Sequence, residues 1–203
     1  MKNIQLNLFG DPTEVESTSH QKPQSKITKV NDEYIIEMFL LYPKSKDNPD
    51  GDPVAKQGDR STLLPRKNAR IITQNGMKFY RKEDLYISHY QPKLISDTEK
   101  SLMTQAKLYM RSTPIFTKSV IIEYVNYYFS PLKSFTKAQK LQISNGQSIP
   151  KTTKPDLADN LNKLLMDSLN EVVFKDDALI WNVKESSKQY SAFPGVAIKL
   201  RGS

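Results

Sequence analysis

Hydrophobic positions divide the chain into a few strongly patterned segments. Between residues 157 and 172 they recur at helical spacing, which predicts an amphipathic helix with one buried stripe: Leu157, Leu161, Leu164, Leu165, Leu169 and Val172. Residues 94–110 carry a second helical pattern, and residues 134–141 a short polar one. Runs rich in β-branched and aromatic residues predict strands at 34–42, 117–129, 178–183 and 194–200. Asn75-Gly76 predicts a hairpin turn between 69–73 and 77–80.

These elements predict an α+β fold, a mixed sheet of four or more strands packed with helices. We expect the folded part to cover residues 29–203, with its first strand starting after Asp32. The composition of residues 1–28 predicts a flexible tail, because the middle of this segment is rich in Ser, Thr, Pro, Gln and charged residues. A long loop rich in Pro, Gly and basic residues is expected at 43–70. Such loops are commonly functional, although a merely solvated insertion is the alternative.

Composition narrows the class of protein. The chain has no cysteine, which excludes a disulfide framework and a zinc–thiolate site and suits a reducing cytoplasm. No apolar run is long enough to span a membrane, so we expect no membrane partner. Thirty basic against twenty-two acidic residues give a net charge of +8, which favours a polyanionic partner.

Candidate chemistry is concentrated between residues 154 and 177. Pro155 suits a helix start, and the expected helix places a polar face opposite its leucines: Asp156, Asp159, Lys163 and Asp167. A second acidic pair, Asp176-Asp177, precedes an expected strand. Two or three carboxylates together suit a hard divalent cation, and we expect the two groups to meet at one end of the helix–strand unit. The alternative is that the first pair caps the helix and the second lies in a solvated turn.

These residues carry a resemblance to a known family. The run Lys154-Pro155-Asp156, Asp159-Asn160-Leu161 and Lys163, followed by Asp167-Ser168-Leu169-Asn170 and Lys175-Asp176-Asp177, resembles the RusA family of bacterial and phage Holliday-junction resolvases. The resemblance implies a homodimeric, Mg²⁺-dependent endonuclease, with Mn²⁺ as the expected substitute, acting on four-way DNA junctions. It implies that three aspartates bind the metal, namely Asp156, Asp159 and Asp177, with Asp176 as the alternate for Asp177. Lys163 completes the implied catalytic set.

The resemblance also implies a DNA-binding loop after the first strand. The residues assigned to DNA on this basis are all basic: Lys56, Arg60, Arg66, Lys67, Arg70 and Lys154. For the homodimer we expect the aromatic strand around 124–129 to form the contact.

One departure from the family pattern affects the metal site. The family has one residue between its first two aspartates, whereas this chain has Leu157 and Ala158 between Asp156 and Asp159. If Pro155 and Asp156 lie before the helix, the extra residue is absorbed at the cap; otherwise the first ligand is uncertain. Two other functions therefore stay open: a flap or branched-DNA nuclease with the same chemistry, and a catalytically inactive DNA-binding adaptor.

The amino terminus carries a separate motif. Residues 5–9 resemble the peptide by which bacterial DNA-processing proteins dock onto the sliding clamp, with Gln5, Leu6, Leu8 and Phe9 as the docking residues. A short extended peptide of this kind buries its apolar side chains in a hydrophobic groove. The alternative is a stray edge strand, since Ile4, Leu6 and Leu8 alternate with polar residues.

Overall fold

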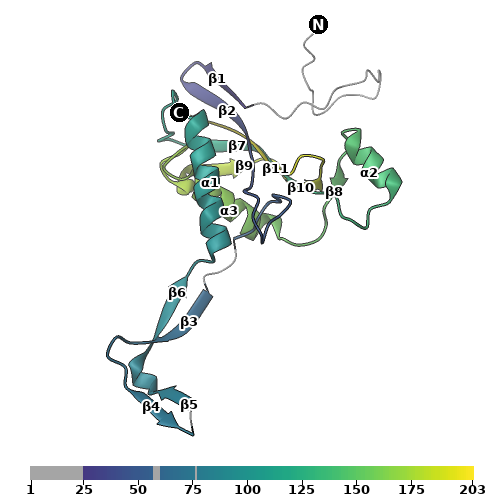
Figure 1. The fold of residues 1–203 in the computed structure, drawn as a ribbon. Helices are drawn as coiled ribbons and strands as arrows, with labels where there is room; N and C mark the ends of the chain where they lie inside the picture. The colour runs from purple at the N-terminus through teal and green to yellow at the C-terminus, as the bar shows by residue number, and fades with distance from the viewer. Residues whose placement is uncertain (1–24, 57–59, 76) are drawn as a thin grey trace.

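The computed structural model describes residues 25–56, 60–75 and 77–203, and its body is a seven-stranded mixed sheet (Figure 1). The strands follow the order β1-β2-β11-β7-β10-β8, and β9 pairs with β7 beside β10. Their bounds are β1 (Lys26–Val30), β2 (Glu33–Leu40), β7 (Val120–Phe129), β8 (Ile149–Pro150), β9 (Ile180–Val183), β10 (Ser186–Tyr190) and β11 (Gly195–Gly202). The predicted α+β class with a mixed sheet is confirmed.

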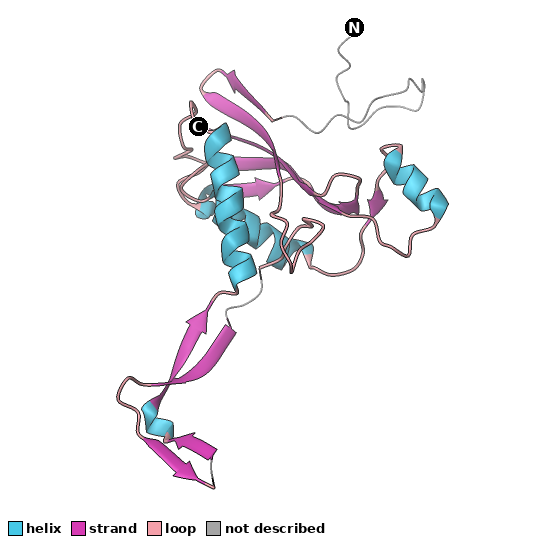
Figure 2. Cartoon of the chain, viewed as in Figure 1, coloured by secondary structure: helices cyan, strands magenta, loops and turns pink. Residues whose placement is uncertain are grey.

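The core lies between this sheet and two helices. Along β7 the side chains of Val120, Ile122, Val125, Tyr127 and Phe129 are buried, as expected for a strand with one face in the core. Helix α1 (Lys93–Tyr109) buries Leu102 and Ala106 among others, and α3 (Asn162–Leu169) buries its leucines completely. The two helices pack against each other (Figure 2). No described helix is both long and apolar enough to cross a bilayer.

Helix α3 is the crossover between two parallel strands. It follows β7 in the chain and precedes β9, and both β9 and β10 run parallel to β7. A parallel connection needs such a crossover, and its helix must present an apolar face to the sheet. This requirement explains why Leu164, Leu165 and Leu169 lie on one buried side, as the sequence pattern predicted.

A two-stranded arm projects from the body between β2 and α1 (Figure 1). Its inner part pairs β3 (Arg60–Pro65) with β6 (Leu85–Tyr90), and its outer part pairs β4 (Ile71–Gln74) with β5 (Met77–Tyr80). A short 3₁₀ turn, η1 (Lys82–Asp84), joins β5 to β6. Strands β4 and β5 pair as the Asn-Gly hairpin predicted, whereas β3 lies within the expected 43–70 loop and β6 in a segment to which we had assigned no element.

Other elements differ from the sequence-based expectations for reasons of pairing. Strand β1 starts at Lys26, inside the segment assigned to the tail, because it pairs with β2. The Ser-containing segment between the predicted strands 178–183 and 194–200, to which we assigned no strand, forms β10, because β7 and β8 pair with its two edges. Helix α2 (Lys137–Ser144) starts later than expected, since Thr136 caps it. Strand β7 has β11 on one side and β9 and β10 on the other, so its edge is not available for a dimer contact.

The first half of the expected 43–70 loop is an ordered connection built around Asn48. Its buried side chain donates to the carbonyls of Pro43 (3.2 Å) and Asp52 (3.0 Å) and accepts from the Asp52 N–H (3.0 Å). The Asp52 carboxylate in turn accepts from the Ser130 N–H at 2.7 Å, which joins the loop to the end of β7. Asn48 therefore fixes the path by which the chain enters the arm.

Replacing Asn48 by alanine should lower the free energy of unfolding by about 1–3 kcal/mol, because buried backbone groups lose their partners. Urea denaturation measures this change. Asn68→Ala, at an exposed position of the arm, is the matched control and should change stability by less than about 0.5 kcal/mol. Equal effects of the two substitutions would contradict the assigned role.

Candidate active site

The helix that carries the predicted site begins with a widened turn. Residues 154–163, here called the acidic turn, start with a cis Lys154–Pro155 bond and an extended Asp156. They continue as a π-helical turn, η2 (Leu157–Leu161), before α3. The Leu161 N–H donates to the Asp156 carbonyl at 3.2 Å, and the Asn162 N–H donates to the Leu157 carbonyl. Both bonds span five residues instead of the usual four.

The wide turn accommodates the residue by which this chain exceeds the family spacing. Leu161 is fully buried and Leu157 packs against the core. In an α-helical turn one added residue would rotate everything ahead of it by about 100°. The π turn takes up that residue and keeps both leucines on the core side. Pro155 and Asp156 stay ahead of the helix, as the first of our two alternatives required, although the extra residue is absorbed within the first turn.

Strands β7 and β10 hold both ends of the acidic turn. The Lys188 ammonium donates to the carbonyls of Thr153 (2.6 Å) and Pro155 (2.7 Å), just ahead of Asp156. The Tyr127 hydroxyl donates to Asn162 Oδ1 at 2.9 Å, and Asn162 Nδ2 lies 3.4 Å from Ser186 Oγ. Burial raises the pKa of Tyr127 well above its usual value, so this hydroxyl remains a neutral donor. The sequence pattern did not reveal the roles of Lys188 and Ser186, because the composition of β10 does not predict a strand.

The acidic side chains differ in the hydrogen bonds that they make within the fold. Asp156 occupies the N-cap position but makes no side-chain capping bond, so the cap interpretation does not account for it. The Asp176 carboxylate accepts from the Ala178 N–H at 2.9 Å and caps η3 (Asp177–Leu179). The exposed Asp177 carboxylate has no hydrogen bond to any described group, which leaves it the better ligand of that pair. Asp159 lies within η2, and its side chain is outside the described part of the structure. Exposed carboxylate oxygens are the donors that Mg²⁺ prefers, so the residues fit that ion.

Within one chain the two acidic groups lie toward opposite ends of β7. The acidic turn is held at Lys188, which pairs with Tyr127. Asp177 precedes Ile180, which pairs with Val120, and the Lys175 N–H donates to the Phe116 carbonyl. Val120 and Tyr127 are about 23 Å apart at about 3.3 Å per strand residue. Among the described side chains no three acidic or histidine residues gather closely enough to hold a metal. We had expected the two groups to meet, and the ladder does not bring them together in one chain.

Comparison with known families decides the class. A family model described as endodeoxyribonuclease RusA matches residues 64–201, more than half of the chain. The chain belongs to the RusA endodeoxyribonuclease family. The matched region includes the acidic turn, Asp176-Asp177 and most of the arm. Comparison with curated proteins gives no match. The RusA family is a family of endodeoxyribonucleases, enzymes that hydrolyse DNA phosphodiester bonds.

The basic residues that the RusA resemblance assigned to DNA have different surroundings. Lys56 lies at the base of the arm and forms ion pairs with Glu99 and Asp167, so its charge is already partnered. Arg66 and Lys67 are exposed between β3 and β4, and Arg70 directly precedes β4. Arg60 begins β3, and Lys154 is exposed at the start of the acidic turn. The clamp-docking residues Gln5, Leu6, Leu8 and Phe9 lie outside the described residues, and clamp binding stays a prediction.

Deleting Ala158 should convert η2 into an ordinary α-helical turn and restore the RusA spacing between the first two aspartates. Because Ala158 is exposed and only the added residue is removed, the thermal unfolding midpoint should fall by less than about 4 °C. Deleting Met166 inside α3 is the control, since it rotates Leu164 and Leu165 away from Leu169. Calorimetry should show a loss of cooperative unfolding for the Met166 deletion. Comparable losses for both deletions would show that η2 is not an independent bulge.

Proposed function

We propose that this RusA-family protein resolves Holliday junctions as a Mg²⁺-dependent homodimer. The observation that carries the proposal is the acidic turn: Asp156 and Lys163 are exposed there, and the fold uses neither side chain for a hydrogen bond or ion pair with a described residue. Asp156, Asp159 and Asp177 would hold the cation, with Mn²⁺ expected to substitute. When bound, Mg²⁺ supplies Lewis-acid charge and a more acidic water for phosphodiester hydrolysis.

The remaining chemistry belongs to the chain itself. Lys163 is the last residue of the acidic turn and follows Asp159 by four residues, and its ammonium would stabilise the negative charge that develops on the phosphate. Lys188 holds the backbone ahead of Asp156 and Tyr127 holds the side chain of Asn162 at the other end, which restricts how far the carboxylates move. The absorbed extra residue favours an active enzyme over an inactive adaptor, because η2 leaves Asp156 exposed and ahead of the helix.

We propose further that each metal site combines two chains. The acidic turn and Asp177 are separated along β7 in one chain, so a second chain has to supply the missing carboxylate. Among the described strands β9 pairs with β7 on one side, and its other edge is open. The side chains of Trp181 and Val183 on β9 are 65% and 43% exposed. Exposed apolar residues on an open edge favour pairing with another strand.

A two-fold contact at this edge would complete the site. Antiparallel pairing of two β9 strands, centred between Trp181 and Asn182, sets Asp177 of the second chain opposite Ser186. The Ser186 hydroxyl lies 3.4 Å from Asn162 at the end of the acidic turn. Closed two-fold symmetry then produces two identical sites, which suits paired cleavage of a four-way junction. This open edge replaces the 124–129 strand as the proposed dimer contact.

The arm is the proposed DNA-binding element. Between residues 60 and 90 it has seven basic and two acidic side chains, which gives +5 of the net +8 of the whole chain. Each of its two ladders also has an apolar face open to solvent: Leu63 and Ile87 lie opposite each other and are 63% and 61% exposed, and Met77 is 60% exposed. A two-stranded ribbon fits the DNA major groove, and the charge disfavours a second copy of the arm as its partner.

Mixed dimers test the metal site and its two-chain composition together. Asp159→Asn and Asp177→Asn homodimers should each lose cleavage of a synthetic four-way junction while retaining binding, because each lacks a ligand in both sites. Co-expressing the two variants should restore nicking, since one site of the mixed dimer keeps all its carboxylates. The Asp156→Asn and Asp159→Asn pair is the control and should not recover, because both substitutions fall in the acidic turn.

Flap and duplex substrates in the same assay establish selectivity for the junction. Absence of rescue in the Asp159→Asn and Asp177→Asn mixture would place each site within a single chain. Near-normal cleavage by both homodimeric variants would overturn the metal site altogether.

Binding of the arm to phosphates should appear in the salt dependence of junction affinity. Replacing Arg66, Lys67 and Lys78 by alanine should reduce the slope of log affinity against log salt by about 0.9 for each phosphate that is no longer neutralised. The control replaces three exposed lysines in and before α2, Lys133, Lys137 and Lys140, and should leave the slope unchanged. Equal slopes for the arm variant and the unmodified protein would rule out this role.

A further inference from the structure

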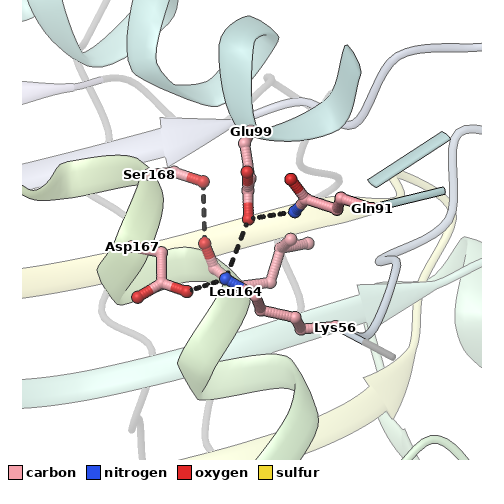
Figure 3. Close-up of polar contacts among 6 residues, drawn as sticks. All are labelled: Lys56, Gln91, Glu99, Leu164, Asp167 and Ser168. Carbon is pink, nitrogen blue, oxygen red and sulfur yellow. Dashed lines mark hydrogen bonds and ion pairs between the residues drawn. The ribbon is translucent and has the colours of Figure 1, made fainter. Parts of the chain in front are cut away.

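Described residues on both sides of the arm contact one carboxylate of α1. Lys56 comes shortly before β3, and its ammonium lies 3.3 Å from Glu99 Oε1. Gln91 directly follows β6, and its Nε2 donates to the same Glu99 oxygen at 2.9 Å (Figure 3). Lys56 ahead of the arm and Gln91 directly after it therefore meet at a single point on the body.

Lys56 also joins this point to the acidic turn. Its ammonium forms a second ion pair with Asp167 on α3, one helical turn beyond Lys163 (Figure 3). Its backbone N–H donates to the carbonyl of Asn160, the residue after Asp159, at 3.1 Å. The same residue thus touches α1, α3 and η2, whereas the arm itself extends away from all three (Figure 1).

The surroundings of Lys56 distinguish this cluster from an ordinary surface ion pair. The side chains of Lys56, Glu99 and Asp167 are 20–27% exposed, so they are only partly screened by water. Burial lowers the pKa of Lys56, but the hydrogen bond to Asp167 and the charges of Glu99 and Asp167 outweigh it and raise the pKa above its usual value. Lys56 therefore keeps its positive charge through neutral and moderately alkaline pH.

We infer that Lys56 is a positioning residue that couples the arm to the acidic turn. When the arm binds DNA, its position relative to the body is constrained at Lys56 and Gln91. Lys56 transmits this constraint to Asp167 through the ion pair and to Asn160 through the backbone hydrogen bond. The inference rests on the proposed function, since it assigns to the arm a control over the cleavage site. It differs from the phosphate contact first expected of Lys56, because its ammonium faces two carboxylates of its own chain.

Separate measurements of cleavage and binding distinguish the two roles. Lys56→Met should slow single-turnover junction cleavage by about tenfold at saturating enzyme. Junction affinity should change by less than about twofold, since a lysine paired within its own chain does not bind a phosphate. Lys56→Arg keeps the charge and should recover most of the rate. Lys140→Met, which removes an exposed lysine of α2, is the control for charge and should cleave normally.

Amide hydrogen exchange supplies a readout that does not depend on activity. In Lys56→Met the peptides covering 157–165 should exchange several-fold faster than in the unmodified protein, because η2 loses the support of the Lys56 cluster. The same peptides in Lys140→Met should be unaffected. If Lys56→Met does not fold, Asp167→Asn breaks the link on the α3 side and should give the same two effects.

The outcomes separate this inference from the proposed function. Normal cleavage and normal exchange in Lys56→Met would overturn the inference while leaving junction resolution intact. A fall in junction affinity matching the fall in rate would also overturn it, because Lys56 would then bind DNA directly. If the unmodified protein does not cleave junctions, the proposed function fails, and the exchange of 157–165 still decides whether Lys56 supports the acidic turn.

Discussion

The packing of α3 against the sheet is the constraint on which the rest of this structure depends. Leu161, Leu164, Leu165 and Leu169 are fully buried between the sheet and α1, so the helix cannot rotate without exposing them. Under the proposed function the turn ahead of it has the opposite requirement, because carboxylates that hold a metal have to face solvent. The π turn satisfies both, since it changes the direction of the residues before Leu161 without moving the stripe. In this chain the added residue therefore lies in a turn that leaves the buried stripe of α3 in place.

The sequence predicted those elements whose conformation follows from their own hydrophobic period or turn residues. The ten residues of β7 and the stripe of α3 follow their hydrophobic periods, and the β4–β5 hairpin follows its Asn-Gly turn. Strand β10 was missed because Ser186, Ser187, Lys188 and Gln189 have no strand preference, and pairing with β7 and β8 decides their conformation. Strand β1 was missed for a different reason: Ile27, Thr28 and Val30 suit a strand, but they directly follow the polar segment assigned to the tail, and the partner strand β2 orders them.

The roles of the site residues stay predictions, but the structure shows which of their surroundings the sequence did not reveal. The resemblance suggested the carboxylates and the lysine, because spacing along a helix is a local property. It does not show that Asp176 is occupied as a cap, or that Lys188 holds the backbone before Asp156. Lys56 was assigned to DNA from its charge, whereas it pairs with Asp167, 111 residues away. Contacts over such separations depend on how strands and helices assemble, and no periodicity in the sequence encodes them.

The position of β11 has a consequence for biosynthesis. This strand, Gly195–Gly202, is made after every other strand described, yet it lies between β2 and β7 and pairs with both. Until it leaves the ribosome, the β1–β2 hairpin has no ladder to the strands that support the acidic turn. Nascent chains generally form structure from the amino terminus as they emerge. In this protein the β1–β2 hairpin therefore joins the rest of the described sheet only after β11 has been made, even though β1 and β2 are the first of its strands to be synthesised.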